Sequence, residues 1–295
     1  MAKSFHLNQE AYILENDELK VCVLKNFGAK IASITHKKTD FEFLFQPSLK
    51  KYQLPIPNGD FADFDTSGLD DTIPTIDTCN YPGTTDLLPD HGDVWSREWE
   101  FSLRGSLLNA SIQLVSVPLL FERGMELRDN RLVLSYSLTN NTGKGYHYLW
   151  ALHGLNRIEE NTRLLFLKRE VDIMNVKDDR IFDFDWRNLY EFPDKSSYKF
   201  YMSKELSTDK VGLYYPSKQL SYIIHFNPSE LPYLGVWFTK GGFKGEYNCA
   251  LEPCNGFYDS LERCVENGKS AFIEPFSQKT WKVEIEIRDD VEGDC

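Results

Sequence analysis

The segment RLVLSYSLTN, residues 131–140, places Leu132, Leu134, Tyr136 and Leu138 at every second position. Successive side chains of a β-strand point to opposite faces of its sheet, so this period predicts a strand with one buried face. Turn sequences such as NFGA and NNTGKG follow strand-like segments. The repetition predicts an all-β protein built from large antiparallel sheets. The same tendency recurs at 19–25, 30–36, 41–45, 109–117, 220–226 and 280–288.

Helical periodicity is scarce. Residues 257–267 predict one short helix that ends near Gly268, and residues 203–209 predict one further helical turn. Residues 46–95 form the longest stretch without a strand pattern and are rich in proline, glycine and aspartate. Long irregular loops in a compact domain often carry function. Because the chain shows no internal repeat and no linker, we expect one domain over residues 1–295.

The charge balance excludes some classes of partner. The chain carries 33 lysines and arginines against 45 aspartates and glutamates, for a formal net charge of −12. A nucleic-acid partner is disfavoured because phosphate backbones require clustered cations, and an anionic membrane surface is disfavoured for the same reason. The N-terminal residues lack the apolar core of a signal peptide, and no apolar run could span a bilayer. We therefore expect a cytoplasmic protein whose six cysteines are reduced thiols.

The first candidate site residue is His153. Taken as one strand, GYHYLWALHGLN (145–156) has one face that mixes polar and small side chains and one apolar face. His153 lies near the end of this strand, before Gly154. A sheet of this kind packs its apolar side on the core and lines a solvated cleft with the other. The mixed face carries His147, Leu149, Ala151 and His153.

The second candidate is Glu252, in the segment GEYNCALE (245–252). This segment has the same two kinds of face, with Ala250 and Glu252 on the mixed one. Pro253 follows and predicts that the strand ends at Glu252, because proline cannot donate a hydrogen bond to an inner ladder. The small side chains beside His153 and Glu252 leave room for a ligand.

Two other segments supply aromatic and basic candidates. Residues 231–245 place Trp237 on a strand face, where its ring can stack on the apolar side of a sugar or pack in the core. Residues 87–100 place His91 in an acidic loop that leads into a predicted strand with Arg97. Trp237, His91 and Arg97 are therefore candidate substrate-binding residues.

Taken together, these segments resemble the galactose mutarotase (aldose 1-epimerase) superfamily, and in particular its bacterial mutarotase-like branch. The resemblance covers nearly the whole chain and is most specific in the closing region, where the catalytic glutamate of the family precedes a proline. It implies a β-supersandwich of large antiparallel sheets. The segments that carry it are YILENDELKVCVLKNFGAKIASITHKKTDFEFLF (12–45), GLDDTIPTI (68–76), LPDHGDVWSREW (88–99), WALHG (150–154) and the region from GVWFTKGG to KVEI (235–285).

The resemblance also implies roles for three residues. Glu252 resembles the general base of the family, His153 its general acid, and His91 the histidine that helps to bind the sugar ring. An aldose exchanges its anomers by ring opening: a base takes the anomeric hydroxyl proton and an acid protonates the ring oxygen. A carboxylate and an imidazole suit these two tasks. The expected activity is therefore an isomerase that needs no metal and no organic cofactor.

Several alternatives stay open at this point. A carbohydrate-binding protein without activity would use the same fold, and a glycosidase would need a second carboxylate beside Glu252. A phosphorylated sugar would need cations at the cleft rim. The segment DFDTSG (63–68) mimics the start of a calcium loop, but Pro74 stands where that loop needs a glutamate. The sugar and the choice between monomer and homodimer are not specified by the sequence. Candidate rim cations are Lys240, Lys244, Arg97 and Arg157.

Overall fold

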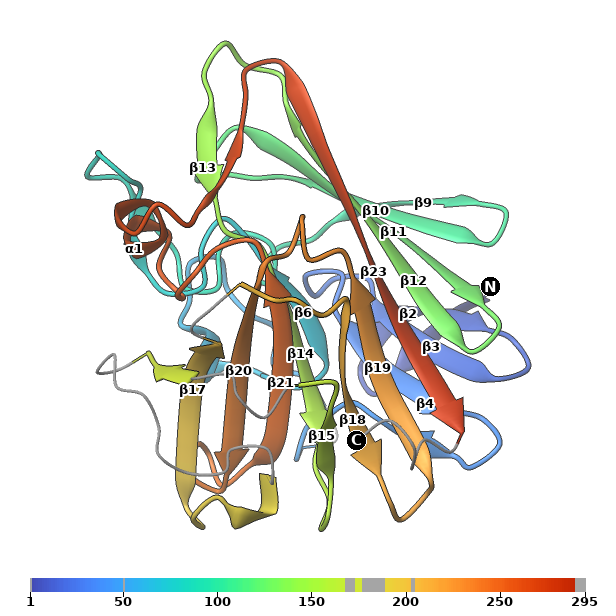
Figure 1. Cartoon of the computed structure of the whole chain (residues 1–295). Helices are drawn as coiled ribbons and strands as arrows, with labels where there is room; N and C mark the ends of the chain where they lie inside the picture. Colours follow the sequence, from blue (N-terminus) through green and yellow to red (C-terminus); the bar gives the residue numbers. More distant parts are fainter. Residues whose placement is uncertain (1, 50, 168–172, 177–188, 203–204, 290–295) are drawn as a thin grey trace.

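The computed structural model describes residues 2–49, 51–167, 173–176, 189–202 and 205–289. Nearly all of its regular structure is β-strand, and strands lie in two large sheets that pack face to face (Figure 1). Neighbouring strands pair antiparallel, for example β11 with β12 and β20 with β21. The predicted all-β class with large antiparallel sheets is confirmed. Among the described residues, no helix has the length and apolar character needed to cross a membrane.

The first sheet has 11 strands and carries the candidate site. Its short strand β5 (Phe41–Glu42) pairs with β4 off the main path. The other strands follow in the order β1 (Ala2–His6), β2 (Gln9–Glu15), β3 (Leu19–Leu24), β4 (Ile31–His36), β6 (Leu69–Thr72), β14 (Ala151–Arg157), β21 (Tyr247–Cys254), β20 (Tyr233–Lys240), β17 (Ser196–Met202) and β16 (Ile173–Asn175).

The second sheet has eight strands and covers one face of the first. Its long strand β23 pairs with both β12 and β19, and Figure 1 shows it in red across the molecule. The order is β15 (Arg163–Leu165), β18 (Lys210–Tyr215), β19 (Leu220–Phe226), β23 (Ser277–Asp289), β12 (Arg131–Asn140), β11 (Leu119–Arg128), β10 (Leu107–Gln113) and β9 (Glu100–Arg104).

Short elements lie outside the two sheets. The helix α1 (Leu261–Glu266) begins after Ser260, whose side chain accepts a hydrogen bond from the Arg263 backbone N–H as an N-cap. The remaining elements are the pairs β7 (Cys79–Asn80) with β8 (Leu87–Leu88) and β13 (Tyr146–Tyr148) with β22 (Ala271–Ile273), and the 3₁₀ turns η1 (Phe61–Asp63) and η2 (Leu189–Glu191).

The main core fills the space between the sheets. Leu152 of β14 and Leu251 of β21 point into it, together with side chains of the second sheet such as Phe121 and Leu134. Because side chains alternate along a strand, the residues next to Leu152 and Leu251 point to the opposite, outer face of the first sheet. His153 and Glu252 therefore lie on this outer face.

A buried ion pair ties the two sheets together. Arg123 of β11 lies with its Nη1 atom 2.6 Å from Asp71 Oδ2 on β6, and neither side chain is exposed. Its second nitrogen, Nη2, donates to the backbone carbonyl of Ala29. The other Asp71 oxygen accepts a hydrogen bond of 3.1 Å from the Trp150 indole. This network satisfies a buried charge that would otherwise destabilise the fold.

Some sequence predictions of local structure were wrong. The segment 145–156 is two strands, β13 and β14, in different sheets, so His147 does not share a strand with His153. Residues 95–99 are not a strand, and residues 205–209 form no helix. The other two residues of that predicted helical turn lie outside the described part of the chain.

The strand that holds Glu252 also continues where proline was expected to end it. β21 extends through Pro253 to Cys254 and lies inside the sheet, with Pro253 opposite Leu234 of β20. On its other side, β21 pairs with β14 at Ala151–Cys254 and at Leu155–Ala250, with no register pair between them. The proline is tolerated because the inner ladder is interrupted beside it.

Candidate active site

A cavity of about 360 Å³ opens on the outer face of the first sheet. Loops around Phe61, His91 and Asp259 form its walls, and β14, β17 and β20 form its floor. Residues lining it include Asp60, Phe61, Thr66, Asp77, Asp90, His91, His153, Leu155, Lys199, Trp237, Phe243 and Asp259. A wider depression of about 900 Å³ shares Asp60, Asp77 and Asp90 but lacks the histidines and Trp237.

The floor is a row of facing positions on neighbouring strands. His153 of β14 pairs with Asp70 of β6, and Glu252 of β21 pairs with Gly235 of β20. The register pairs Ala151–Cys254 and Leu155–Ala250 place His153 and Glu252 opposite each other, midway between them. Alternation on antiparallel strands therefore brings the two predicted catalytic residues side by side on one face.

Glu252 lies below the cavity surface. It is completely buried and is not one of the cavity-lining residues. Its Oε2 atom is ion-paired with the ammonium of Lys199, which does line the cavity, while its Oε1 atom is buried without a hydrogen-bond partner. Burial raises the pKa of the Glu252 carboxyl, Lys199 opposes that rise, and Asp259 adds to it.

Lys199 lies between two carboxylates. Besides Glu252, its Nζ atom lies 3.4 Å from Asp259 Oδ1, and the same Asp259 oxygen accepts a hydrogen bond of 2.7 Å from the Tyr201 hydroxyl. Burial alone would lower the pKa of Lys199, but Asp259 and Glu252 raise it above its ordinary value. The lysine is therefore a stable cation at the wall of the cavity.

His153 lies opposite Glu252 in the sheet and lines the cavity. It is 6% exposed, and its Nδ1 atom is buried without a partner. Burial holds the pKa of its imidazole well below 6.5, and Coulomb interactions with His91, Lys199 and Lys30 lower it further. The ring is therefore uncharged at neutral pH in the protein without sugar.

His91 is held by the loop that carries it. Its ring stacks on Phe61 at a centroid distance of 4.1 Å, and its Nδ1 atom lies 2.9 Å from Asp90 Oδ1. The other Asp90 oxygen accepts a hydrogen bond from the Phe61 backbone N–H. Gly92 follows at φ +73°, where an added Cβ would lie 2.0 Å from the Ile73 carbonyl oxygen. The tight turn after His91 thus requires glycine.

Trp237 lies on the floor at the next row of the sheet. Its register partners are Ala250 on β21 and Lys199 on β17. Its indole N–H donates to the Asn248 side chain at 3.1 Å, and Phe243 packs edge-on against its ring. The small Ala250 beside it leaves the ring accessible from the cavity, so it can act as a stacking platform.

The predicted rim cations do not gather at the cavity. Arg97 does not line it and reaches Asn58 at 3.5 Å. Lys240 bonds the Phe192 carbonyl, Lys244 the Phe64 carbonyl and Arg157 the Glu159 carboxylate. Of the cavity-lining residues in the described part of the chain, Lys199 is the one lysine or arginine.

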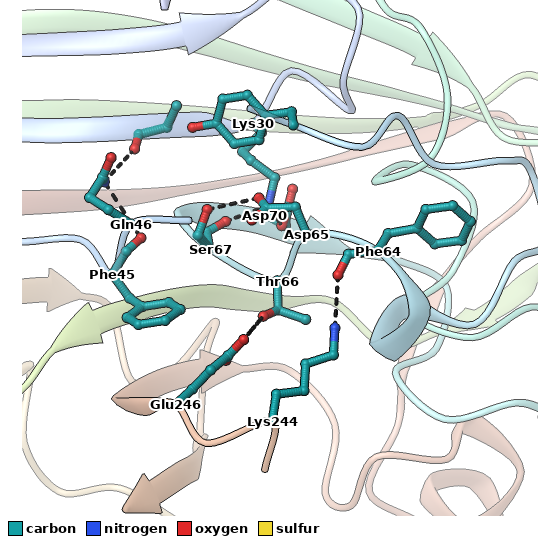
Figure 2. Close-up of polar contacts among 12 residues, drawn as sticks. Lys30, Phe45, Gln46, Phe64, Asp65, Thr66, Ser67, Asp70, Lys244 and Glu246 are labelled. Carbon is teal, nitrogen blue, oxygen red and sulfur yellow. Dashed lines mark hydrogen bonds and ion pairs between the residues drawn. The ribbon is translucent and has the colours of Figure 1, made fainter. Parts of the chain in front are cut away.

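A second polar cluster lies beside the floor and accounts for the segment that resembles a calcium loop (Figure 2). The buried Lys30 ammonium lies 2.6 Å from Asp70 Oδ2 and 3.8 Å from Asp65 Oδ2. The Ser67 hydroxyl donates to Asp65 at 2.7 Å, and its backbone carbonyl accepts from Lys30. These oxygens therefore serve an ammonium. Within the described residues, no group of three or more His, Cys, Asp or Glu side chains is arranged to hold a metal ion.

Sequence reasoning missed Lys199, Asp259 and Phe61. Lys199 lies in SSYKFYM, where it shares a strand face with Tyr201, but strand 196–202 was not recognised. Asp259 lies just before α1, in the segment that was assigned to a helix. Alternation in SSYKFYM was an available signal for β17, whereas nothing in the sequence alone indicates its neighbours in the sheet.

Comparisons with known proteins address the fold. No protein-family model matches the sequence, and no curated protein shows significant similarity to it. Solved structures do match. The Slr1438 protein of Synechocystis sp. PCC 6803 has a TM-score of 0.75 at 17% identity and covers 98% of this chain and 100% of its own. A galactose mutarotase-like protein from Lactobacillus casei has a TM-score of 0.73 at 14% identity and covers 94% of this chain and 100% of its own.

A third structure, a galactose mutarotase related enzyme from Lactobacillus acidophilus, has a TM-score of 0.70 at 16% identity. The match covers 96% of this chain and 98% of that chain. Identities this low show a shared fold and leave the chemistry to be argued from the site. The chain therefore has the galactose mutarotase-like fold that the sequence resemblance predicted.

Proposed function

We propose that this protein is an isomerase that interconverts the α and β anomers of an aldose by acid–base ring opening. The observation that carries the proposal is that His153 and Glu252 face each other on β14 and β21, beside a cavity that is lined by His153, His91 and Trp237. The fold shared with a galactose mutarotase-like protein supports the same class of activity.

In this proposal Glu252 is the base and His153 is the acid. The Oε1 atom of Glu252 has no partner, so it is the oxygen we assign to the anomeric hydroxyl proton. As that proton leaves, the bond between the anomeric carbon and the ring oxygen breaks, and His153 in its protonated state donates a proton to the ring oxygen. The open-chain aldehyde rotates and recloses with the two roles reversed.

The remaining residues bind and orient the sugar. Trp237 stacks on the apolar face of the ring, and His91, fixed by Phe61 and Asp90, hydrogen-bonds a ring hydroxyl. Four aspartates line the described cavity, and the charge of Lys199 is offset by Glu252 and Asp259. This balance favours an uncharged aldose over a phosphorylated one.

The structure also supplies a second candidate function. The sequence offered no carboxylate partner for Glu252, but Asp259 contacts the same lysine and lines the cavity. A pair of carboxylates is the machinery of a glycosidase. We rank this function second because Asp259 is engaged by Tyr201 and Lys199 and is not free to face a glycosidic bond.

The direct test follows anomer exchange in freshly dissolved aldoses by NMR, with and without protein. Acceleration for at least one aldose supports the proposal. The same samples, with disaccharides added, report hydrolysis, which would favour the glycosidase. Saturation-transfer contacts to a sugar without exchange or hydrolysis would instead identify a carbohydrate-binding protein.

A further inference from the structure

We infer that Lys199 is a positioning residue that keeps the buried Glu252 carboxylate ionised and ready to accept a proton. This inference deepens the proposed function and rests on it for its meaning in catalysis. The ion pair between Lys199 and Glu252 can itself be tested without turnover.

The first step concerns the cost of burying a charge. Glu252 has no exposed surface, and its neighbours in the row are Gly235, which offers no side chain, and His153, whose imidazole has a pKa held well below 6.5. An ionised carboxylate in such a place loses several kcal/mol of solvation unless a cation compensates it. Lys199 is the cation whose ammonium contacts it.

The second step concerns why the lysine stays in place. Lys199 extends from β17 beside Trp237, and Asp259 holds the ammonium from the opposite side at 3.4 Å. The Tyr201 hydroxyl fixes that aspartate at 2.7 Å. The lysine therefore has two carboxylate contacts that hold it, and the Tyr201 side chain that fixes Asp259 belongs to a buried apolar cluster.

The third step concerns the balance of charges on the base. Lys199 lowers the pKa of Glu252, whereas Asp259 raises it. A base works best when its pKa lies near the working pH, so that it is both ionised and able to take a proton. Lys199 and Asp259 therefore shift the pKa of Glu252 in opposite directions. The direction of the pKa change on removing either residue can be predicted.

The test is a pH titration of the Glu252 side-chain carboxyl by ¹³C NMR in glutamate-labelled protein without sugar, with Glu252→Gln used to assign the signal. An opposite charge in contact shifts a carboxyl pKa by about 1–3 units. Lys199→Met should therefore raise the Glu252 midpoint by about 1–3 pH units, and Lys199→Arg should restore it toward the wild-type value. Asp259→Asn should lower it.

The matched control is Lys240→Met, which removes a lysine of the neighbouring strand β20 that is paired with Asp194 and does not line the cavity. It should leave the midpoint unchanged. An unchanged midpoint in Lys199→Met, or shifts of the same sign in Lys199→Met and Asp259→Asn, would overturn the inference. If Lys199→Met does not fold, the Asp259→Asn titration decides alone. A wild type that exchanges no aldose would refute the proposed function and leave these titrations valid.

Discussion

His153 and Glu252 face each other across β14 and β21, midway between the register pairs Ala151–Cys254 and Leu155–Ala250. Their strands are separated by about 90 residues of sequence, on the order of the length of a small domain. Antiparallel pairing nevertheless brings an imidazole and a carboxylate to one place on the outer face of the sheet. An acid and a base that act on the same sugar ring need this proximity.

The substitution Glu252→Gln tests the proposed base. Glutamine keeps the size of the side chain and its hydrogen-bonding capacity but removes its basicity. Sugar binding to Trp237 and His91 should persist, while the rate of anomer exchange should fall by on the order of 10²-fold or more. Exchange spectroscopy measures the rate, and saturation-transfer NMR measures binding.

Glu100→Gln is the matched control, because Glu100 is an exposed glutamate of β9 in the second sheet and does not line the cavity. It should leave the exchange rate within about twofold of the wild-type rate, since surface changes of this kind cost little. Full activity in Glu252→Gln, on a sugar that the wild type turns over, would show that another group is the base.

The strand pattern was predictable from sequence wherever one face of a strand is apolar. The segment 131–140 alternates and is β12, with Leu132, Leu134 and Leu138 in the core. β6 was missed because its sequence, LDDT, carries two charged residues. Each aspartate is buried against a cation from a distant segment, Asp70 against Lys30 and Asp71 against Arg123.

Only part of the candidate site could be predicted from sequence, because its burial and ion pairs also depend on segments that are distant in the chain. The sequence indicated His91, His153 and Trp237 as site residues, and all three line one cavity in the structure. Glu252 was expected to face the cleft, but it lies beneath Lys199. The burial of Glu252 and its pairing with Lys199 depend on contacts between strands that are far apart in the sequence. The alternation of side chains within one strand cannot predict such contacts.

The ion pair between Arg123 and Asp71 should make a large contribution to stability. Arg123→Met keeps an apolar chain of similar length but leaves Asp71 buried without its cation. Breaking a buried pair in this way costs about 3–5 kcal/mol in the free energy of unfolding. Urea denaturation followed by tryptophan fluorescence measures the change.

A surface pair provides the comparison. Arg131 is 37% exposed at its side chain and lies 2.7 Å from Glu284. Arg131→Met should cost only about 0–1 kcal/mol, because exposed pairs are screened by water. The double variant Arg123→Met with Asp71→Asn should recover part of the loss. Equal losses in Arg123→Met and Arg131→Met would contradict the role assigned to the buried pair.

The charge of the cavity predicts a preference among sugars. Among the described residues that line the cavity, Lys199 is the one lysine or arginine, and Glu252 and Asp259 already pair with it. A phosphate in the cavity would therefore meet aspartates and no unpaired ammonium or guanidinium group. At equal concentrations, a neutral aldose should therefore be exchanged at least about tenfold faster than its 6-phosphate, equivalent to about 1.4 kcal/mol. Competition NMR with both sugars measures the ratio, and a preference for the 6-phosphate would contradict the charge argument.

The opposite pKa shifts of the two proposed catalytic groups predict how activity depends on pH. The productive state has an ionised Glu252 and a protonated His153, so the pair holds one proton. Burial raises the pKa of Glu252 and lowers that of His153, so the pH range over which the carboxyl is ionised and the imidazole is protonated becomes narrower. The plot of activity against pH should still be bell-shaped. At low pH a second proton binds and neutralises the base Glu252, and at high pH the loss of the first proton leaves His153 unable to act as an acid. The apparent pKa of each limb of the profile then describes the coupled pair and not one residue alone.

This account makes a prediction for His153 itself. A histidine with an ordinary pKa of about 6.5 would be half protonated at that pH. Because the pKa of His153 is held well below this value, its ring nitrogens should show the ¹⁵N shifts of a neutral imidazole at pH 6 in the sugar-free protein. His153→Gln identifies the signal and should also slow exchange by on the order of 10²-fold, since the ring oxygen loses its proton donor. An imidazolium signal for His153 at pH 6 would mean that a negative charge offsets the burial, and the limbs would then report Glu252 on the acid side and His153 on the alkaline side.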